Sequence, residues 1–392
     1  MTPGSSAGVL DLDCPAATDG ELAVINHRSV LDRCWHVLRR WPNRPGIAEQ
    51  IVDGEHRQAH FLGDTMALDR LALLSSELHE RDPLSPDTHL IAGQIASMRH
   101  HFADAKDHLV KAEAFGAPAD GVTRVRLATL QALGEDLPAV LSARRVMSDA
   151  TGDLSDLVPL GALLADLGKI AEADKTYLKA IRSYRDLSPF PLAWVCFHLG
   201  VLWAEMAPEP QPPRAAHWYR KAIAYLPAYT HARVHLAELH LDAGELEVAE
   251  ALLVPVEGSG DPEVMWRLAQ ISEAAGRTGE ARMRLACARS AFDALLVPHE
   301  LAFADHAAEF YLTVGGDAAR ARDLALINWA NRPTLRARKL ALATIEATGE
   351  AHLASALFIR AQFGPYNGQI SLHSTTGAAV SETGSFRPQD TP

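Results

Sequence analysis

Three side chains between residues 231 and 238 have the types and spacing of metal ligands. His231, His235 and Glu238 are separated by four and then three residues, so a helix would present all three on one face. Two neutral imidazoles one turn apart can hold a transition metal, and His198 and His306 are candidates to complete the coordination. The HExxH motif is absent, however, and the same side chains would serve equally well as hydrogen-bonding groups in a binding groove. The sequence therefore predicts no cofactor and leaves these residues as candidate metal ligands.

Sequence signals of catalysis are missing. The chain has no GxSxG elbow, no GxxxxGK[ST] phosphate loop and no GxGxxG following a strand. Cys196 and His198 are two residues apart, and residues at that spacing on a helix point in different directions, so they do not form a nucleophile pair. We expect a protein that is not an enzyme, although a site assembled from several segments would leave no linear motif.

Composition and charge narrow the possible partners. The 392 residues include 37 basic and 49 acidic side chains, and the formal charge of −12 argues against nucleic-acid binding through the overall field. No run of about 18 apolar residues occurs, so membrane insertion is not expected. The first residues lack a basic and an apolar region, and the four cysteines have no CxxC spacing. These features predict a cytoplasmic protein with reduced thiols.

An internal repeat supplies the elements that would position the candidate residues. The equivalent alanines Ala215 and Ala249 are 34 residues apart, and Ala249 and Ala281 are 32 apart. The interval from Ala173 to Ala215 is 42 residues, and the surplus coincides with the proline-rich segment 208–213, which predicts a lengthened turn. The best copies share a Leu-Gly or Leu-Ala pair, a small residue, an aromatic or leucine and a second small residue: Leu160, Gly161, Ala173, Tyr177 and Ala180; Leu199, Gly200, Ala215, Tyr219 and Ala222; Leu236, Ala237, Ala249 and Leu253; Leu268, Ala269, Ala281, Leu285 and Ala288.

The order of these residues has a steric explanation. Apolar residues three and four apart place a stripe on a first helix, glycine ends that helix, and a second stripe follows on an antiparallel partner. Small residues at Gly161 and Ala173 allow the two backbones to approach closely, whereas Tyr177 and Ala180 are expected to pack toward the next pair. Pro227 then stops the second helix of its copy.

On these residues the sequence resembles the tetratricopeptide repeat (TPR) family, and specifically its bacterial type. The 34-residue helix-turn-helix unit of that family carries the same Leu-Gly, Ala, Tyr or Phe, Ala and Pro order. The resemblance implies an all-α fold, a right-handed α-solenoid (TPR superhelix) of about nine helix-turn-helix units. We expect a disordered N-terminus (1–20), an N-terminal capping helix (21–46), the superhelix (47–363) and a flexible C-terminal tail (364–392).

The resemblance also implies which side chains face the concave groove, where repeat proteins usually bind. Aromatic, imidazole and charged residues are expected to gather on the groove of the central to C-terminal repeats. An alternative is that several of the aromatics fill the space between repeats. The groove residues implied by the register are Trp194, Phe197, His198, His231, Val234, His235, Glu238, Trp266, Arg267, Gln270, Phe303, His306, Phe310, Arg336 and Lys339.

Two basic features of the groove bear on the partner. A subset of the family grips C-terminal carboxylates with a Lys/Asn/Lys/Arg clamp. Here Arg126, Arg267, Arg336 and Lys339 are scattered and the asparagines are missing, so a chaperone-tail adaptor is disfavoured. The locally basic stretch from Asp317 to Thr344 could receive an acidic partner segment or form a solvated charged face.

The sequence as a whole predicts a scaffold or adaptor that binds a peptide or a partner protein in its concave groove. Two alternatives stay open. One is a small-molecule or metal-binding sensor that uses the histidines and aromatics of the groove. The other is a non-catalytic partner subunit of an enzyme.

Overall fold

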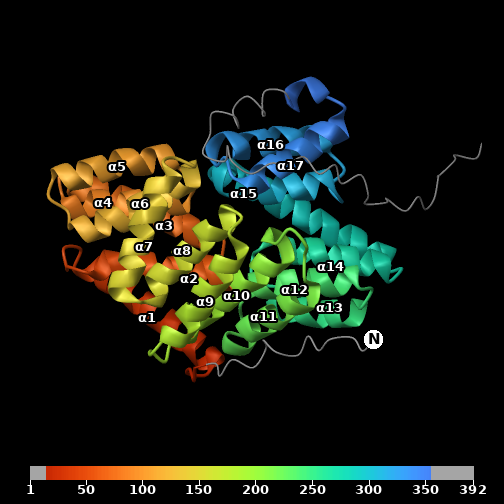
Figure 1. Ribbon diagram of the computed structural model, residues 1–392, viewed down its shortest axis with the longest axis horizontal. Coiled ribbons are helices and arrows are strands. Elements are labelled where there is room, and N and C mark those ends of the chain that lie inside the picture. The colour runs from red at the N-terminus through yellow and green to blue at the C-terminus, as the bar shows by residue number, and fades with distance from the viewer. Residues whose placement is uncertain (1–14, 355–392) are drawn as a thin grey trace, which may run out of the picture.

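The computed structural model describes residues 15–354, and every regular element in that part of the chain is helical. The prediction of an all-α chain is confirmed for these residues. Successive helices pack as antiparallel pairs joined by short turns (Figure 1). The first nine are α1 (Gly20–Arg40), α2 (Ile47–Leu62), α3 (Ala67–Arg81), α4 (Pro86–Met98), α5 (Phe102–Ala114), α6 (Ala119–Leu133), α7 (Leu137–Thr151), α8 (Leu154–Asp166) and α9 (Ile170–Ser183). They are followed by α10 (Pro189–Val201), α11 (Pro212–Tyr225), α12 (Thr230–Asp242), α13 (Leu246–Leu253), α14 (Pro262–Ala274), α15 (Thr278–Leu312), α16 (Ala318–Asn331) and α17 (Leu335–Thr348).

Two residue types set many of the helix boundaries. Proline is the first residue of α4, α10, α11 and α14, where its missing N–H costs no helical hydrogen bond. Gly168, Gly244 and Gly276 lie in the turns between paired helices and have φ values of 71° to 75°. That left-handed conformation suits glycine because a Cβ would clash there.

Two irregular segments shape the central and C-terminal repeats. A π-helical turn, Leu202–Met206, extends α10 before the proline-rich segment leads into α11, as the lengthened repeat predicts. The 35-residue α15 contains Pro298, and His299 has non-helical dihedral angles of φ −137° and ψ 35°. The helix changes direction there, so its two halves act as separate members of neighbouring pairs.

Glycine allows two tyrosine rings to pack against the first helix of their own pair. A Cβ built on Gly161 would lie 2.5 Å from Cε1 of Tyr177, and one on Gly200 would lie 2.2 Å from Cε1 of Tyr219. Both tyrosines are fully buried. The predicted close approach is therefore present, but Tyr177 packs within its own pair as well as toward the next one.

The N-terminal helices pack against later ones, since α1 contacts α10 and α2 contacts α12. Phe61 of α2 contacts Phe190 and Tyr229, with ring centroids 5.2 and 4.8 Å apart. Asp69 of α3 pairs with His299 at the kink of α15, at 2.9 Å. Helices near the start of the chain therefore cover part of the concave face that the repeats alone would leave open.

Several predicted segments extend beyond the described residues. Residues 1–14 and 355–392 lie outside them, and so does the predicted tail, 364–392. The predicted capping helix begins as α1, which packs on α2 and also reaches α10. Just before it, the amide of Thr18 donates to the carbonyl of Leu187 at 2.7 Å. Within residues 15–354 no helix is long and apolar enough to cross a membrane.

Candidate functional site: the central cavity

A cavity of about 590 Å³ lies where the N-terminal helices meet the later repeats. Residues of α2, α3, α4, α6, α8, α9, α10, α12, α14, α15, α16 and α17 line it, together with the π-helical turn after α10. A second cavity of about 360 Å³ adjoins it. The two share Glu205, His235, Glu263, His306 and Arg336, so together they form one recess, called the central cavity below.

One part of the central cavity, called the imidazole end, contains His56, His60 and His198, and Phe197 lies beside His198. The hydroxyl of Tyr229 lies 3.2 Å from Nε2 of His60, and the rings of His56 and His60 stack at 5.6 Å. Burial lowers the pKa of His198 to about 4. His100 lies elsewhere on the cavity wall, where it feels the charges of Arg332, Asp305 and His306, and burial with the charge of Arg332 lowers its pKa to about 4 as well. Burial and the neighbouring histidines hold the pKa of His60 well below 6.5. These imidazoles are therefore neutral at pH 7.

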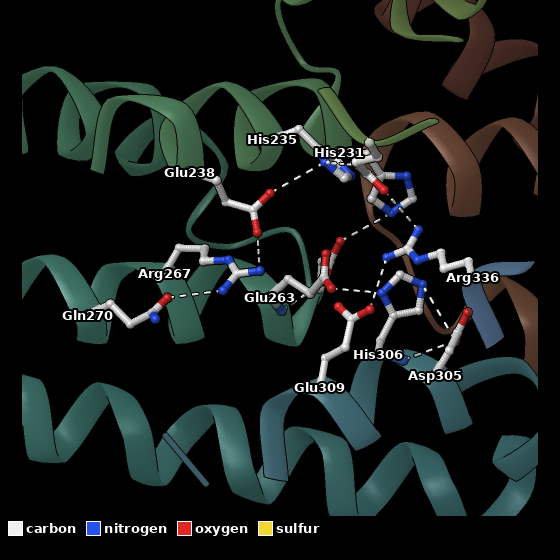
Figure 2. Close-up of polar contacts among 12 residues, drawn as sticks. His231, His235, Glu238, Glu263, Arg267, Gln270, Asp305, His306, Glu309 and Arg336 are labelled. Carbon is white, nitrogen blue, oxygen red and sulfur yellow. Dashed lines mark hydrogen bonds and ion pairs between the residues drawn. The ribbon is translucent and has the colours of Figure 1, made fainter. Parts of the chain in front are cut away.

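A second part of the cavity, called the charged end, is formed by Glu205, His235, Glu238, Glu263, Arg267, Asp305, His306, Glu309 and Arg336. Figure 2 shows His306 between two carboxylates, with Nδ1 2.7 Å from Oε1 of Glu263 and Nε2 3.7 Å from Oδ1 of Asp305. Burial alone would lower the pKa of His306, but Asp305 and Glu263 outweigh it and raise that pKa to about 10. Burial would likewise raise the pKa of Glu263, but the charge and hydrogen bond of His306 hold it well below its usual range. This end thus keeps a protonated imidazole at neutral pH.

His235 occupies a second carboxylate pair in the charged end. Its Nδ1 lies 3.2 Å from Oε1 of Glu205 and 3.3 Å from Oε2 of Glu238. Burial opposes protonation of His235, but the hydrogen bond to Glu205 and the charges of both carboxylates raise its pKa. Burial raises the pKa of Glu238, and the basic partners His235 and Arg267 only partly offset that effect.

Two arginines complete the charged end. Arg267 pairs with Glu238, donates to Oε1 of Gln270 at 3.0 Å and lies over the ring of Trp266 at 3.6 Å (Figure 2). Arg336 lies 3.5 Å from Glu205 and 3.3 Å from Glu309. Its side chain is 43% exposed, so the charged end opens to solvent on this side.

The repeat positions two of the cavity histidines in the same way. His198 of α10 stacks on Tyr177 with ring centroids 5.7 Å apart, and His235 of α12 stacks on Tyr219 at 5.6 Å. Each tyrosine in turn rests on the glycine of its own pair. A glycine, a tyrosine and a histidine therefore form a stack that recurs in consecutive repeats.

The structure brings ten of the fifteen predicted groove residues to the cavity wall. They are Phe197, His198, His231, His235, Glu238, Arg267, Gln270, Phe303, His306 and Arg336.

The other five predicted groove residues do not line the cavity. Val234, Trp266 and Phe310 are 1%, 2% and 0% exposed and belong to the packed core, and for the two aromatics this is the placement that the alternative of inter-repeat filling expects. Val234 and Trp266 share their register position with Phe197, which does line the cavity, so the position alone does not decide whether a side chain reaches the recess. Trp194 packs against the core beside His198, at 5.4 Å, and Lys339 is exposed.

Sequence reasoning missed several cavity residues. His56 and His60 come from α2, and only the return of the N-terminal helices brings them to the later repeats. Glu205 lies in the π-helical turn, outside the repeat register. Glu309 lies three residues after His306, a spacing that places both on one helical face and could have suggested it.

The candidate metal ligands do not converge. Nε2 of His231 lies 3.3 Å from Oδ2 of Asp261, whereas His235 and Glu238 contact each other. Among residues 15–354 no group of three or more His, Cys, Asp or Glu side chains is arranged to hold a metal ion.

Comparisons with known proteins gave structural likenesses alone. No family model matches the sequence, and no curated protein matches it. Similar solved structures include Cut9 in the APC/C hetero-tetramer Cut9-Hcn1, with a TM-score of 0.45 and 16% identity over 69% of this chain. The match spans 52% of that chain, about half its length.

Two further structures are similar. Yeast Tom70 has a TM-score of 0.44 and 14% identity over 87% of this chain and 82% of its own. The C-terminal part of a TPR repeat-containing protein from Cytophaga hutchinsonii has a TM-score of 0.36 and 16% identity, over 64% of this chain and 98% of its own.

Proposed function

We propose that the protein is a non-catalytic interaction scaffold that binds a short segment of a partner protein in the central cavity. The observation that carries the proposal is one recess whose polar side chains are already held in place by neighbours from several helices. Such preorganisation lowers the entropic cost of binding, because few side chains must be ordered when a ligand arrives. The recess is open at its charged end, where a segment of a larger protein can enter.

The two ends of the cavity suit a peptide segment better than a ligand of uniform polarity. The imidazole end offers neutral hydrogen-bonding groups beside apolar walls, and the charged end offers fixed ionic groups. Successive side chains of one peptide could meet these different surroundings. The cytoplasmic location and the bacterial type expected from the sequence remain predictions.

A photo-crosslinking experiment tests this proposal. The photoreactive amino acid p-benzoylphenylalanine replaces Phe303, which lines the cavity, and in a matched control it replaces Phe115, which is 41% exposed outside it. Irradiation in cells is expected to attach a protein to position 303 and not to position 115.

Two outcomes would contradict the scaffold. Attachment of a small molecule alone at position 303 would favour the sensor. Equal protein attachment at both positions would show that the cavity is not the binding surface.

A further inference from the structure

A buried hydroxyl in the charged end has no partner among the described residues. Tyr219 is fully buried and lines the second cavity, yet none of those residues forms a hydrogen bond with its Oη. Its ring is fixed between Gly200 and His235, so the hydroxyl cannot swing away to find one. An unpaired buried hydroxyl is costly, and a group entering the cavity could supply the missing hydrogen bond.

Negative charge faces this hydroxyl. Burial and then the carboxylates of Glu205 and Glu238 raise the pKa of Tyr219 well above 10, whereas Arg336 acts in the opposite direction. The hydroxyl therefore stays protonated and lies in the field of two carboxylates. A cation placed here would be attracted by both carboxylates and could donate a hydrogen bond to the tyrosine oxygen.

Carboxylates outnumber basic groups around the whole recess. Eight described carboxylates line the two cavities, against three arginines and the two histidines whose pKa values are raised. The carboxylates are those of Asp166, Glu205, Glu238, Asp242, Asp261, Glu263, Asp305 and Glu309, and the arginines are Arg267, Arg332 and Arg336. The recess thus has an excess of negative charge, in a chain whose formal charge is −12.

Glu205 and Glu238 also keep room for another donor. Glu205 uses one oxygen for His235 and the other for Arg336, and Glu238 divides its oxygens between Arg267 and His235. Each carboxylate oxygen has two acceptor positions, so both side chains can accept a further hydrogen bond without losing these contacts.

We propose that the charged end binds an arginine or lysine side chain of the partner segment, held by Glu205, Glu238 and the hydroxyl of Tyr219. This inference rests on the proposed function and adds the chemistry of the ligand to it. Its polarity is opposite to that of a carboxylate clamp, because here the protein supplies the anions and the partner supplies the cation.

A defined peptide library tests the inference on the full chain. The library contains hexapeptides with acetylated N-termini and amidated C-termini, so that any positive charge belongs to a side chain. The wild type is expected to select an arginine or lysine at one position. Replacing that residue by citrulline or norleucine should weaken binding at least tenfold, because a charge-assisted hydrogen bond is lost.

Three protein variants locate the binding site. Glu238→Gln and Tyr219→Phe should each weaken binding of the selected peptide about tenfold. Glu247 is an exposed glutamate of α13, so Glu247→Gln makes the same charge change as Glu238→Gln and should leave binding unchanged. Because no residue among 15–354 bonds to the hydroxyl, Tyr219→Phe should not lower the melting temperature. In Glu238→Gln, citrulline in the peptide should cost less than in the wild type, since the two changes remove one interaction.

The outcomes separate this inference from the proposed function. Tight peptides without a basic residue, or basic peptides that bind wild type and Glu238→Gln equally, would overturn the inference and leave the scaffold standing. If no hexapeptide is retained, the inference fails as well, and the crosslinking experiment decides the scaffold by itself.

Discussion

His198 and His235 occupy equivalent places in consecutive repeats, but their pKa values shift in opposite directions. Both rings stack on a buried tyrosine that rests on a glycine, at nearly the same distance. Burial lowers the pKa of His198 to about 4, whereas Glu205 and Glu238 overcome burial and raise the pKa of His235. The same packing therefore holds one imidazole whose pKa is lowered and another whose pKa is raised.

The difference comes from residues around the stack. Three residues after His198 the helix has Val201, and three residues after His235 it has Glu238. The π-helical turn adds Glu205 on the side of His235. Packing in a repeat protein can thus be constant while the charge of its inner surface is set by a few neighbouring side chains.

The largest expected effect comes from breaking either stack at its glycine. Gly161→Ala or Gly200→Ala would place a Cβ 2.5 or 2.2 Å from a buried tyrosine ring and should cost about 1–3 kcal/mol of folding stability. Gly200→Ala should disturb the charged end and weaken partner binding, and Gly161→Ala should disturb the imidazole end.

Urea unfolding measures these stability losses, and Gly279→Ala is the matched control. A Cβ at Gly279 meets nothing within 4 Å, and alanine favours a helix over glycine, so that variant should be at least as stable as the wild type. Equal stability of all three variants would mean that the tyrosines do not need the glycines.

Acid should lower the folding stability that the imidazole end contributes. A histidine whose pKa falls from 6.5 to about 4 on folding stabilises the protein above pH 6.5, and this contribution is lost as the pH falls toward 4. For His198 the loss between pH 6.5 and 4.5 should be about 2 kcal/mol, and His198→Gln should lose correspondingly less. Urea midpoints at several pH values measure this, with the exposed His36→Gln as the control. Identical acid profiles for wild type and His198→Gln would contradict a neutral His198.

Alkali should lower the folding stability that the charged end contributes. The pKa of His306 rises from 6.5 to about 10 on folding, so its contribution is complete below pH 6.5 and is lost as the pH rises through 10. Because the side chain is 34% exposed, solvent screening reduces the effect, and we expect about 1–2 kcal/mol. His306→Gln should show a flatter stability profile between pH 7 and 10. If folding stability falls as steeply with rising pH in His306→Gln as in the wild type, then His306 does not stabilise the fold through its charge.

The smallest expected effect comes from giving His198 the neighbouring carboxylate that His235 has. Val201→Glu places a carboxylate three residues after His198, as Glu238 follows His235, and should raise the pKa of His198 by about one unit, equivalent to 1.4 kcal/mol. NMR titration of the His198 ring measures the shift, and Val201→Gln controls for polarity. If both variants titrate alike, the neighbouring carboxylate is not what separates the two histidines.

Much of the repeat could be predicted from local sequence. The glycine, alanine and tyrosine positions predicted the helix pairs and the close approach of their backbones, because these effects involve residues within one pair. The register also brought His198, His235, Arg267 and His306 to the cavity. The register placed Val234 and Trp266 in the groove, but both are buried in the core. Such a position lies at the border between the inner and core faces of its helix, and the packing of the neighbouring helix decides which face it joins.

Other features depended on contacts between distant segments. The sequence determined that this chain forms paired helices, because small residues and period-3.6 stripes act over one or two turns. Only the tertiary structure decided that α2 would cover the concave face, that His60 would join the imidazole end, and that Glu205 would meet His235. Those contacts join residues up to about 170 positions apart, and the charge of a buried histidine depends on which distant carboxylates and apolar side chains surround it.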